Sequence, residues 1–188
     1  EQAWTSDNTD PVDRIDIQHR HTQQSPAITM RAYASESPSP INQRVTPVRF
    51  RFHVAMAGAL GVSGNLREWS AADRGEATEL IALYKRIRGV VAHGQLHRLT
   101  PPAVDRTTAV QYVTADAAET VVLAWRPVAR HAQPEPPVRL AGLDQAARYR
   151  DQDTVGEYHG AVLANGGLPL GLPKGDFASV VRHLRRMG

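Results

Sequence analysis

The sequence contains no cysteine, so disulfide bridges and thiolate metal sites are both excluded. A chain without disulfides is compatible with a reducing compartment, and we expect a cytoplasmic protein. Long apolar runs are also missing, because none approaches the ~18 residues that a membrane-spanning helix needs. We therefore expect no membrane partner. Methionine is scarce as well, and the first one is Met30, so we expect that residue 1 is not the natural start of the protein.

Lysine is nearly absent, because only 2 of the 22 basic residues are lysines and the other 20 are arginines. The net charge is +3, and the basic residues are scattered along the chain. The one cluster is formed by Arg182, His183, Arg185 and Arg186. This distribution is a poor electrostatic footprint for DNA or RNA, so we expect no nucleic-acid partner.

Eight histidines are the remaining candidates for a metal site. His19 and His21 lie two positions apart, and His93 and His97 lie four apart, but neither pair has a third ligand at zinc-like spacing. The glycine-rich turns lack both phosphate-loop patterns, and no Gly-x-Ser-x-Gly element of a serine esterase is present. We expect neither a metal nor a cofactor.

The first segment of the chain is the most informative one. Gln2 to Thr5 is typical of a short strand; a polar turn follows, and Thr9 or Asp10 can cap a helix with proline at its first position. Asp7 thus falls where a strand ends, which is where α/β sheets carry their chemistry. Beside the indole of Trp4 this carboxyl group would be partly desolvated and suited to acid/base work.

A simpler interpretation of the same segment remains open. Asp7, Asp10 and Asp13 all lie near a helix start, where acids commonly cap the helix or match its dipole. Spacing alone does not separate the two interpretations.

Residues 1–94 alternate between strand and helix patterns, as in the closing part of a (β/α)8 barrel. At 188 residues, with 41% hydrophobic content, the chain holds one domain or parts of two. After the first strand we expect a helix to about His21, a strand from Ile28 to Ala34, a loop from Ser35 to Pro47, a helix from Thr46 through Ala59, a strand from Leu60 to Val62 and a helix from Ser70 to about Val91.

Residues 95–188 show a different pattern, with short apolar runs separated by turn residues. The expected strands are Gln95–Leu99, Ala109–Thr114, Glu119–Arg126, Val138–Leu140, Ala147–Arg150 and a closing strand at Phe177–Leu184. This spacing predicts an antiparallel β-sandwich domain.

A resemblance gives these patterns a chemical meaning. The run Trp4-Thr5-Ser6-Asp7-Asn8-Thr9-Asp10 resembles the acid/base segment of glycoside hydrolase family 36, the retaining α-galactosidases. Collinear blocks that also resemble the family are Phe50–Gly61, Glu79–Arg88, Ala109–Val113, Leu140–Asp144 and Ala147–Tyr149. The resemblance therefore extends in order over nearly the whole chain.

By this resemblance Asp7 is the catalytic acid/base, Trp4 a substrate-binding residue, and the partner an α-galactoside such as a raffinose-type sugar. The family's nucleophile is an aspartate two residues after a lysine, upstream of the acid/base segment, and the chain has no such residue there. One Lys-x-Asp run exists, Lys174-Gly175-Asp176, which we interpret as a surface turn. We thus expect a C-terminal fragment with half of the catalytic pair, inactive alone, from an enzyme that is homo-oligomeric at full length.

The sequence departs from the family at the end of the second strand. Where relatives carry His-Val-Ser and then Pro-Asn-His-Gln, this chain reads Tyr33-Ala34-Ser35 and then a different loop, so its aglycone preference is open. The alternative function is a non-catalytic carbohydrate-binding or structural β-sandwich module, or an inactive relative. A binding module would need exposed aromatics, and Tyr112, Trp125, Tyr149 and Tyr158 are the candidates after residue 94.

Overall fold

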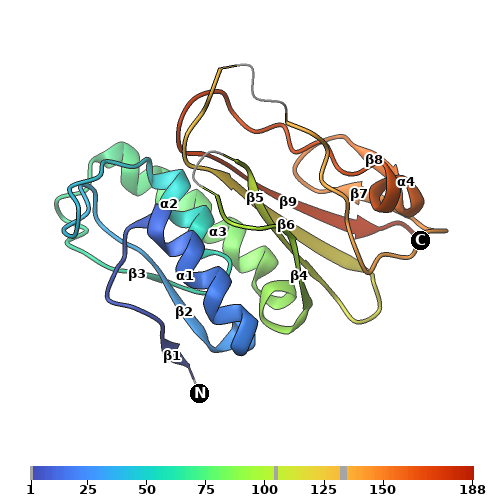
Figure 1. The fold of residues 1–188 in the computed structure, drawn as a ribbon, viewed down its shortest axis with the longest axis horizontal. Coiled ribbons are helices and arrows are strands. Elements are labelled where there is room, and N and C mark those ends of the chain that lie inside the picture. Colours follow the sequence, from blue (N-terminus) through green and yellow to red (C-terminus); the bar gives the residue numbers. More distant parts are fainter. Residues whose placement is uncertain (1, 104–105, 132–134) are drawn as a thin grey trace. The chain divides into compact units, whose positions relative to one another are not determined.

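A computed structural model describes residues 2–103, 106–131 and 135–188. The chain forms two compact units, Glu1–Ala92 and His93–Gly188. The first unit alternates strands with helices, and the second is built on an antiparallel sheet (Figure 1). The predicted change of architecture, from the end of an α/β barrel to a β domain, is confirmed.

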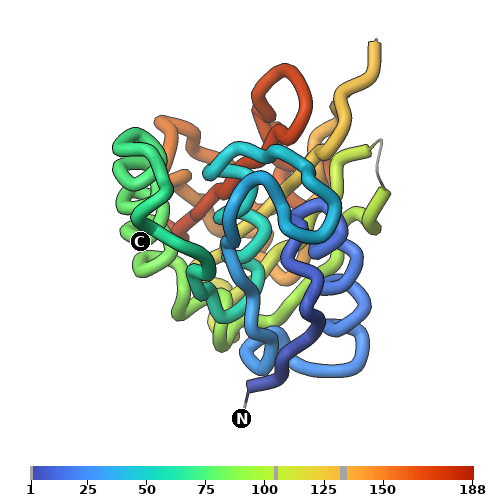
Figure 2. The backbone as a smooth tube through the Cα atoms, turned by 90° about the vertical axis from the view of Figure 1, so that its left-hand side faces the viewer, coloured from blue at the N-terminus to red at the C-terminus, as the bar shows by residue number. Residues whose placement is uncertain are grey.

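The first unit contains a parallel sheet of three short strands in the order β1-β2-β3. These strands are β1 (Ala3–Trp4), β2 (Met30–Ala34) and β3 (Ala59–Val62). Figure 2 follows the dark-blue first run of the chain alongside the next strand, with Trp4 in register with Arg31. Because all three strands are parallel, their carboxyl ends share one edge of the sheet.

Three helices connect and cover these strands, and local signals define their starts. They are α1 (Pro11–Gln24), α2 (Val48–Ala55) and α3 (Ala71–His93), with a short 3-10 turn, η1 (Ala27–Thr29), before β2. The Ser70 hydroxyl accepts a hydrogen bond of 3.0 Å from the Asp73 amide, which is the expected N-cap of α3. Helix α2 is shorter than predicted and ends at Ala55, because the chain turns at Met56–Gly58 to enter β3.

The two faces of this sheet differ in character. Met30, Ala32 and Ala34 point to one face and are fully buried, under α1 and α2 (Figure 1). By strand alternation Trp4, Tyr33 and Gly61 belong to the opposite face. Trp4 is 54% exposed there, as expected for a sheet whose β1 edge has no further strand among the described residues.

The second unit is a six-stranded antiparallel sheet with the order β4-β5-β6-β9-β7-β8. Its elements are β4 (Gln95–Thr100), β5 (Thr108–Val113), β6 (Glu119–Arg126), β7 (Arg148–Asp151), β8 (Glu157–His159), the helix α4 (Gly160–Asn165) and β9 (Ala178–Arg186). The strand expected to close the chain, β9, pairs with both β6 and β7 and is therefore central. Sequence pattern located the strand but not its place in the sheet.

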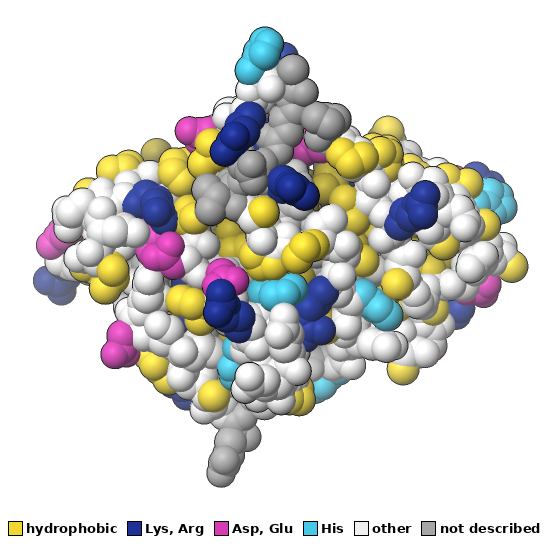
Figure 3. Space-filling view, in the orientation of Figure 1, with side chains coloured by type: hydrophobic (Ala, Val, Ile, Leu, Met, Phe, Trp, Pro, Cys, Tyr) yellow, Lys and Arg dark blue, Asp and Glu magenta, His cyan; other side chains and the backbone are white. Residues whose placement is uncertain are grey.

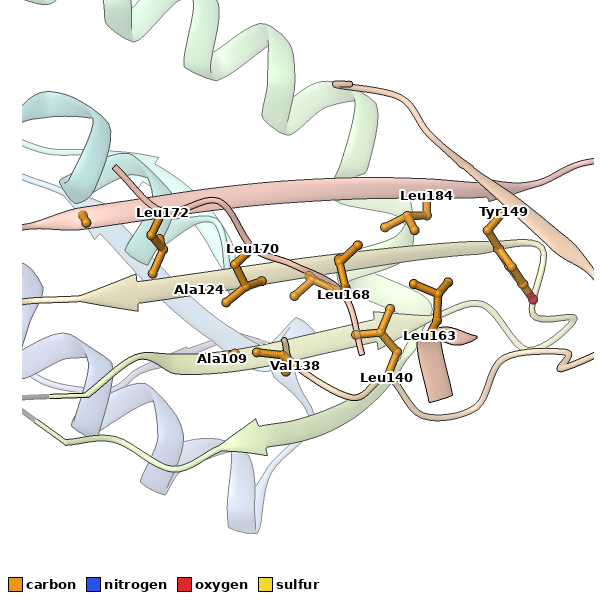
Figure 4. Close-up of a cluster of buried hydrophobic side chains, with 12 residues drawn as sticks. Ala109, Ala124, Val138, Leu140, Tyr149, Leu163, Leu168, Leu170, Leu172 and Leu184 are labelled. Atoms are coloured by element: carbon orange, nitrogen blue, oxygen red, sulfur yellow. The ribbon is translucent and has the colours of Figure 1, made fainter. Parts of the chain in front are cut away.

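A second layer of loops and α4 packs on one face of this sheet. Figure 4 shows its leucines, Leu140, Leu163, Leu168, Leu170 and Leu172, pointing toward sheet residues such as Ala109, Ala124, Tyr149 and Leu184. All of these side chains are buried. The unit thus has two layers around one apolar core, although only one layer is a regular sheet.

The strand predicted at Val138–Leu140 is wrong. Val138 forms an isolated bridge with Leu168, through hydrogen bonds of 3.0 and 2.8 Å, and no ladder continues from it. Two causes are visible in the sequence: Pro136 and Pro137 lack amide donors, and Gly167, with φ +89°, turns the opposing segment away.

A buried ion pair joins two neighbouring strands of the second unit. The Arg182 guanidinium, on β9, donates to Asp151 Oδ2 with an Nε–O distance of 2.6 Å, and Asp151 is 2% exposed. Replacing Arg182 with Met leaves this carboxylate buried without its partner, and we expect a loss of about 3–5 kcal/mol in the free energy of unfolding. Urea unfolding of the chain, followed by circular dichroism, measures it.

The matched control is Arg150→Met. Arg150 pairs with Glu157 at 2.8 Å on the surface of the same sheet, so its loss should change stability by about 1 kcal/mol or less. Equal destabilisation by the two substitutions would contradict a special role for the buried pair.

Candidate active site

The loops that follow the three parallel strands meet at the carboxyl edge of the sheet in the first unit. Asp7 comes three residues after the end of β1, and the loop 35–47 follows β2. The Ser35 hydroxyl donates a 3.2 Å hydrogen bond to the Thr9 carbonyl, which ties the two loops together. In parallel α/β sheets this edge is the usual place for a ligand site.

Asp7 is exposed and is held by a single side chain. The indole nitrogen of Trp4 donates a hydrogen bond of 2.7 Å to Asp7 Oδ1. Among the described residues Asp7 Oδ2 has no hydrogen-bond partner. The Trp4 indole therefore lies beside the Asp7 carboxylate, as predicted. Asp7 is exposed, however, so the described residues do not provide the desolvation that we expected.

The helix-capping role belongs to Asp10 rather than to Asp7. Asp10 Oδ1 accepts hydrogen bonds from the amides of Val12 and Asp13, at 3.0 and 3.1 Å. The Asp10 side chain is fully buried and also forms an ion pair with Arg44, from the loop after β2. The Arg44 guanidinium reaches Asp13 Oδ1 as well, at 3.7 Å. Sequence reasoning missed Arg44, because its partners lie more than 30 positions earlier in the chain.

Short polar side chains complete the turn that contains Asp7. The Asn8 amide nitrogen of the main chain donates to Ser6 Oγ at 3.1 Å, and the Asp10 amide donates to Asn8 Oδ1 at 2.9 Å. The side-chain amide of Asn8 donates to Asp13 Oδ2 at 2.8 Å. The turn is thus fully braced without any contribution from the Asp7 carboxylate.

Two buried arginines brace the main chain of the first unit. Arg14 donates to the carbonyl of Arg31 at 3.0 Å, and Arg51 donates to the carbonyl of Ser35. Burial lowers the pKa of both guanidinium groups, while nearby Tyr33 acts in the opposite direction on Arg14. Arg51 also lies over the ring of Trp69, 5.0 Å from its centroid.

The other candidates from the sequence do not join this edge. Lys174-Gly175-Asp176 is an exposed turn of the second unit, in which Asp176 Oδ1 accepts the Ala129 amide at 2.8 Å. His53 is buried within α2. Over residues 2–103, 106–131 and 135–188, no three His, Cys, Asp or Glu side chains gather where they would hold a metal ion.

The aromatic residues of the second unit are not arranged as a sugar platform. Tyr149 is fully buried, and its hydroxyl donates to the Ala117 carbonyl at 2.8 Å. Tyr158 packs against the same apolar core.

Lys and Arg side chains are spread among neutral ones on the face drawn in Figure 3. In the described part of the chain, no helix has the length and apolarity to cross a membrane.

The parallel sheet with its helices, followed by the antiparallel sheet, defines the class of the protein: the last strands of an α/β barrel and then a β domain. Family comparison agrees with both parts. Residues 1–94 match the family model described as Melibiase, and residues 107–184 match the glycosyl hydrolase family 36 C-terminal domain. The chain belongs to glycoside hydrolase family 36.

Individual relatives are α-galactosidases. A probable α-galactosidase G of Aspergillus terreus is 38% identical over 170 residues, which are 89% of this chain and 23% of that protein. The solved structure of α-galactosidase AgaB from Geobacillus stearothermophilus has 33% identity and a TM-score of 0.93, covering 99% of this chain and 26% of that one. AgaA from the same organism, solved as a variant with raffinose, gives 32% identity, the same TM-score and the same coverage. The chain thus spans about a quarter of the length of its relatives.

The buried Asp10 carboxylate yields a prediction about local stability. Asp10→Ala removes the cap of α1 and the partner of Arg44, so we expect the first turn of the helix to lose about 1–3 kcal/mol. Asp10→Ser keeps a capping oxygen and should lose about 1 kcal/mol less. Hydrogen exchange at the amides of Val12 and Asp13 measures both losses.

Asp16→Ala is the control, because Asp16 only pairs with Arg20 on the exposed surface of the same helix, at 2.7 Å. It should change exchange at those amides by a few tenths of a kcal/mol. Exchange in Asp10→Ala that is no faster than in Asp16→Ala would show that the cap contributes nothing.

Proposed function

We propose that the protein to which this chain belongs is a retaining α-galactosidase and that Asp7 is its acid/base carboxylate. The observation that carries the proposal is the state of Asp7 itself. It lies after β1 at the carboxyl edge, is exposed, and has one oxygen bonded to the Trp4 indole and the other without a partner among the described residues. Its neighbours Ser6, Asn8 and Asp10 already satisfy the turn, so Asp7 has no structural duty there.

The proposed mechanism assigns different tasks to the two Asp7 oxygens. Oδ2 would carry the proton to the departing glycosidic oxygen and then remove a proton from the water that resolves the glycosyl-enzyme intermediate. Oδ1 keeps the indole hydrogen bond throughout. Trp4, 54% exposed beside this carboxylate, would contact the sugar.

A retaining reaction needs a second carboxylate roughly 5–5.5 Å from the first, acting as nucleophile. We propose that it comes from polypeptide outside residues 1–188. Asp176 is not a candidate, because it belongs to the turn of the second unit and binds the Ala129 amide. On this proposal residues 1–94 are the C-terminal part of the catalytic barrel and residues 95–188 a C-terminal β-sandwich domain.

The proposed substrates are terminal α-galactosides of the raffinose type. Support comes from the relatives, since variants of AgaA were solved in complex with raffinose and with stachyose. The loop that carries Arg44 replaces the usual family residues next to the proposed site, so the aglycone preference can differ from that of AgaA. A homo-oligomeric full-length enzyme and a cytoplasmic location remain predictions.

Residues 1–188 alone should hydrolyse no α-galactoside. On this proposal residues 1–188 carry only one carboxylate of the catalytic pair, and among the described residues no strand pairs with the outer edge of β1. Incubating the purified chain with 4-nitrophenyl α-galactoside and following nitrophenol release tests this. Turnover that disappears in Asp7→Asn would overturn the proposal that the nucleophile lies elsewhere.

In the full-length enzyme Asp7→Asn should lower kcat for raffinose by about 10²–10⁴-fold, because protonation of the leaving group is lost. The loss should be smaller for 4-nitrophenyl α-galactoside, whose leaving group needs little protonation. Where the native full-length chain cannot be produced, residues 1–188 can replace the matching quarter of AgaA.

Asp16→Asn, on the exposed face of α1, is the control and should leave both rates unchanged. Undiminished raffinose hydrolysis in Asp7→Asn would exclude Asp7 as the acid/base.

A further inference from the structure

The indole that holds Asp7 is itself held by a neighbouring strand. Trp4 and Tyr33 pack ring against ring, with centroids 4.9 Å apart and planes inclined by 45°. Trp4 lies on β1, which has two residues, and is more than half exposed. The Tyr33 ring therefore favours one orientation of the Trp4 indole over the others that the side chain could adopt.

The Tyr33 ring packs over a glycine on the third strand. Tyr33 and Gly61 are register partners in the β2–β3 ladder. A β-carbon built on Gly61 would lie 2.7 Å from Cε1 and 2.8 Å from Cδ1 of the Tyr33 ring. The ring therefore lies directly over the glycine, in space that any other residue at position 61 would occupy.

We propose that Tyr33 is a positioning residue that acts on Asp7 through Trp4. Gly61 leaves room for the Tyr33 ring, the ring holds the Trp4 indole, and the indole N–H fixes Asp7 Oδ1 at 2.7 Å. The inference rests on the proposed role of Asp7 and extends it to a residue that differs from the usual family sequence. Trp4, Tyr33 and Gly61 lie on three adjacent strands, so the register of the sheet sets the orientation of the Asp7 carboxylate.

The physical reason is the freedom of an exposed carboxylate. An aspartate with one hydrogen-bond donor keeps its orientation only while that donor stays in place. General acid/base transfer depends on heavy-atom distances within hydrogen-bond reach, and a misplacement of about 1 Å can cost roughly 100-fold in rate. A shift of the Tyr33 ring would reach Asp7 through the Trp4 indole, which contacts both.

The direct test is the indole N–H resonance of Trp4 in the 188-residue chain, labelled with ¹⁵N. The chain has three tryptophans, and Trp4→Phe identifies the resonance of Trp4. Asp7→Ala gives the position of this resonance without a hydrogen-bond acceptor at position 7, whereas the amide oxygen of an asparagine could still accept from the indole. We expect Gly61→Ala to move the resonance most of the way toward that position and to speed its hydrogen exchange about 10-fold or more.

Gly75→Ala is the matched control, because Gly75 lies in α3 with no atom within 4 Å of the added carbon. It should leave the Trp4 resonance unchanged. Tyr33→Phe keeps the ring and should also preserve the resonance, whereas Tyr33→Ala should reproduce the effect of Gly61→Ala. Circular dichroism would reveal whether Gly61→Ala disturbs folding. If it does, the comparison of Tyr33→Phe with Tyr33→Ala tests the inference instead. An unmoved resonance in folded Tyr33→Ala overturns the inference.

Kinetics of the full-length enzyme separate this inference from the proposed function. Tyr33→Ala should lower kcat for raffinose by about 10–100-fold, and Tyr33→Phe should restore it. A change in KM would report the sugar contact proposed for Trp4. If Asp7→Asn is fully active, the function proposed for Asp7 fails, while the resonance still decides whether Tyr33 positions it. If Asp7→Asn is inactive and Tyr33→Ala has unchanged kcat, only the positioning role fails.

Discussion

A buried carboxylate, that of Asp10, joins two segments of the first unit. Removing a carboxylate from water is costly unless its oxygens are hydrogen-bonded or paired. Here two helix amides and the Arg44 guanidinium all bind Oδ1, so the start of α1 and the loop after β2 are joined at one point. Oδ2 is buried without a hydrogen-bond partner among the described residues. The turn carrying Asp7 lies just before this point and has its main chain fixed as a consequence.

Arginine supplies the cations of this scaffold, which is consistent with a chain that has 20 arginines and 2 lysines. Arg14 and Arg51 are both buried and donate to main-chain carbonyls near the strand ends. A guanidinium has five donors in a rigid plane and is less strongly hydrated than an ammonium group, so it is better suited to such sites. Lysine in either position would satisfy fewer carbonyls and would be more costly to bury.

Sequence reasoning succeeded where the signal was local. Pro11 after Asp10 located the start of α1, and Ser70 located that of α3, because capping involves residues at most three positions apart. It failed at Val138–Leu140, where apolar residues suggested a strand but the opposing segment turns at Gly167. Sequence reasoning also missed the ion pair of Arg44 and the positioning role proposed for Tyr33, because both depend on partners in other strands and loops. Strand register, which sequence pattern does not determine, brings those partners together.

The two aspartates of the first loop illustrate how environment divides the tasks of one residue type. Asp7 and Asp10 lie three positions apart, and the sequence allows either to be an acid that only stabilises the helix start. Asp10 occupies that position and is fully buried, whereas Asp7 projects outward with a single donor. An aspartate that stabilises the helix accepts hydrogen bonds from the amides of its first turn, as Asp10 does. Asp7 accepts its hydrogen bond from the Trp4 indole instead. Its one restraint is an indole that also faces solvent. Such a restraint contributes little to stability but sets the direction of a carboxylate, which is what the proton transfer proposed for Asp7 requires.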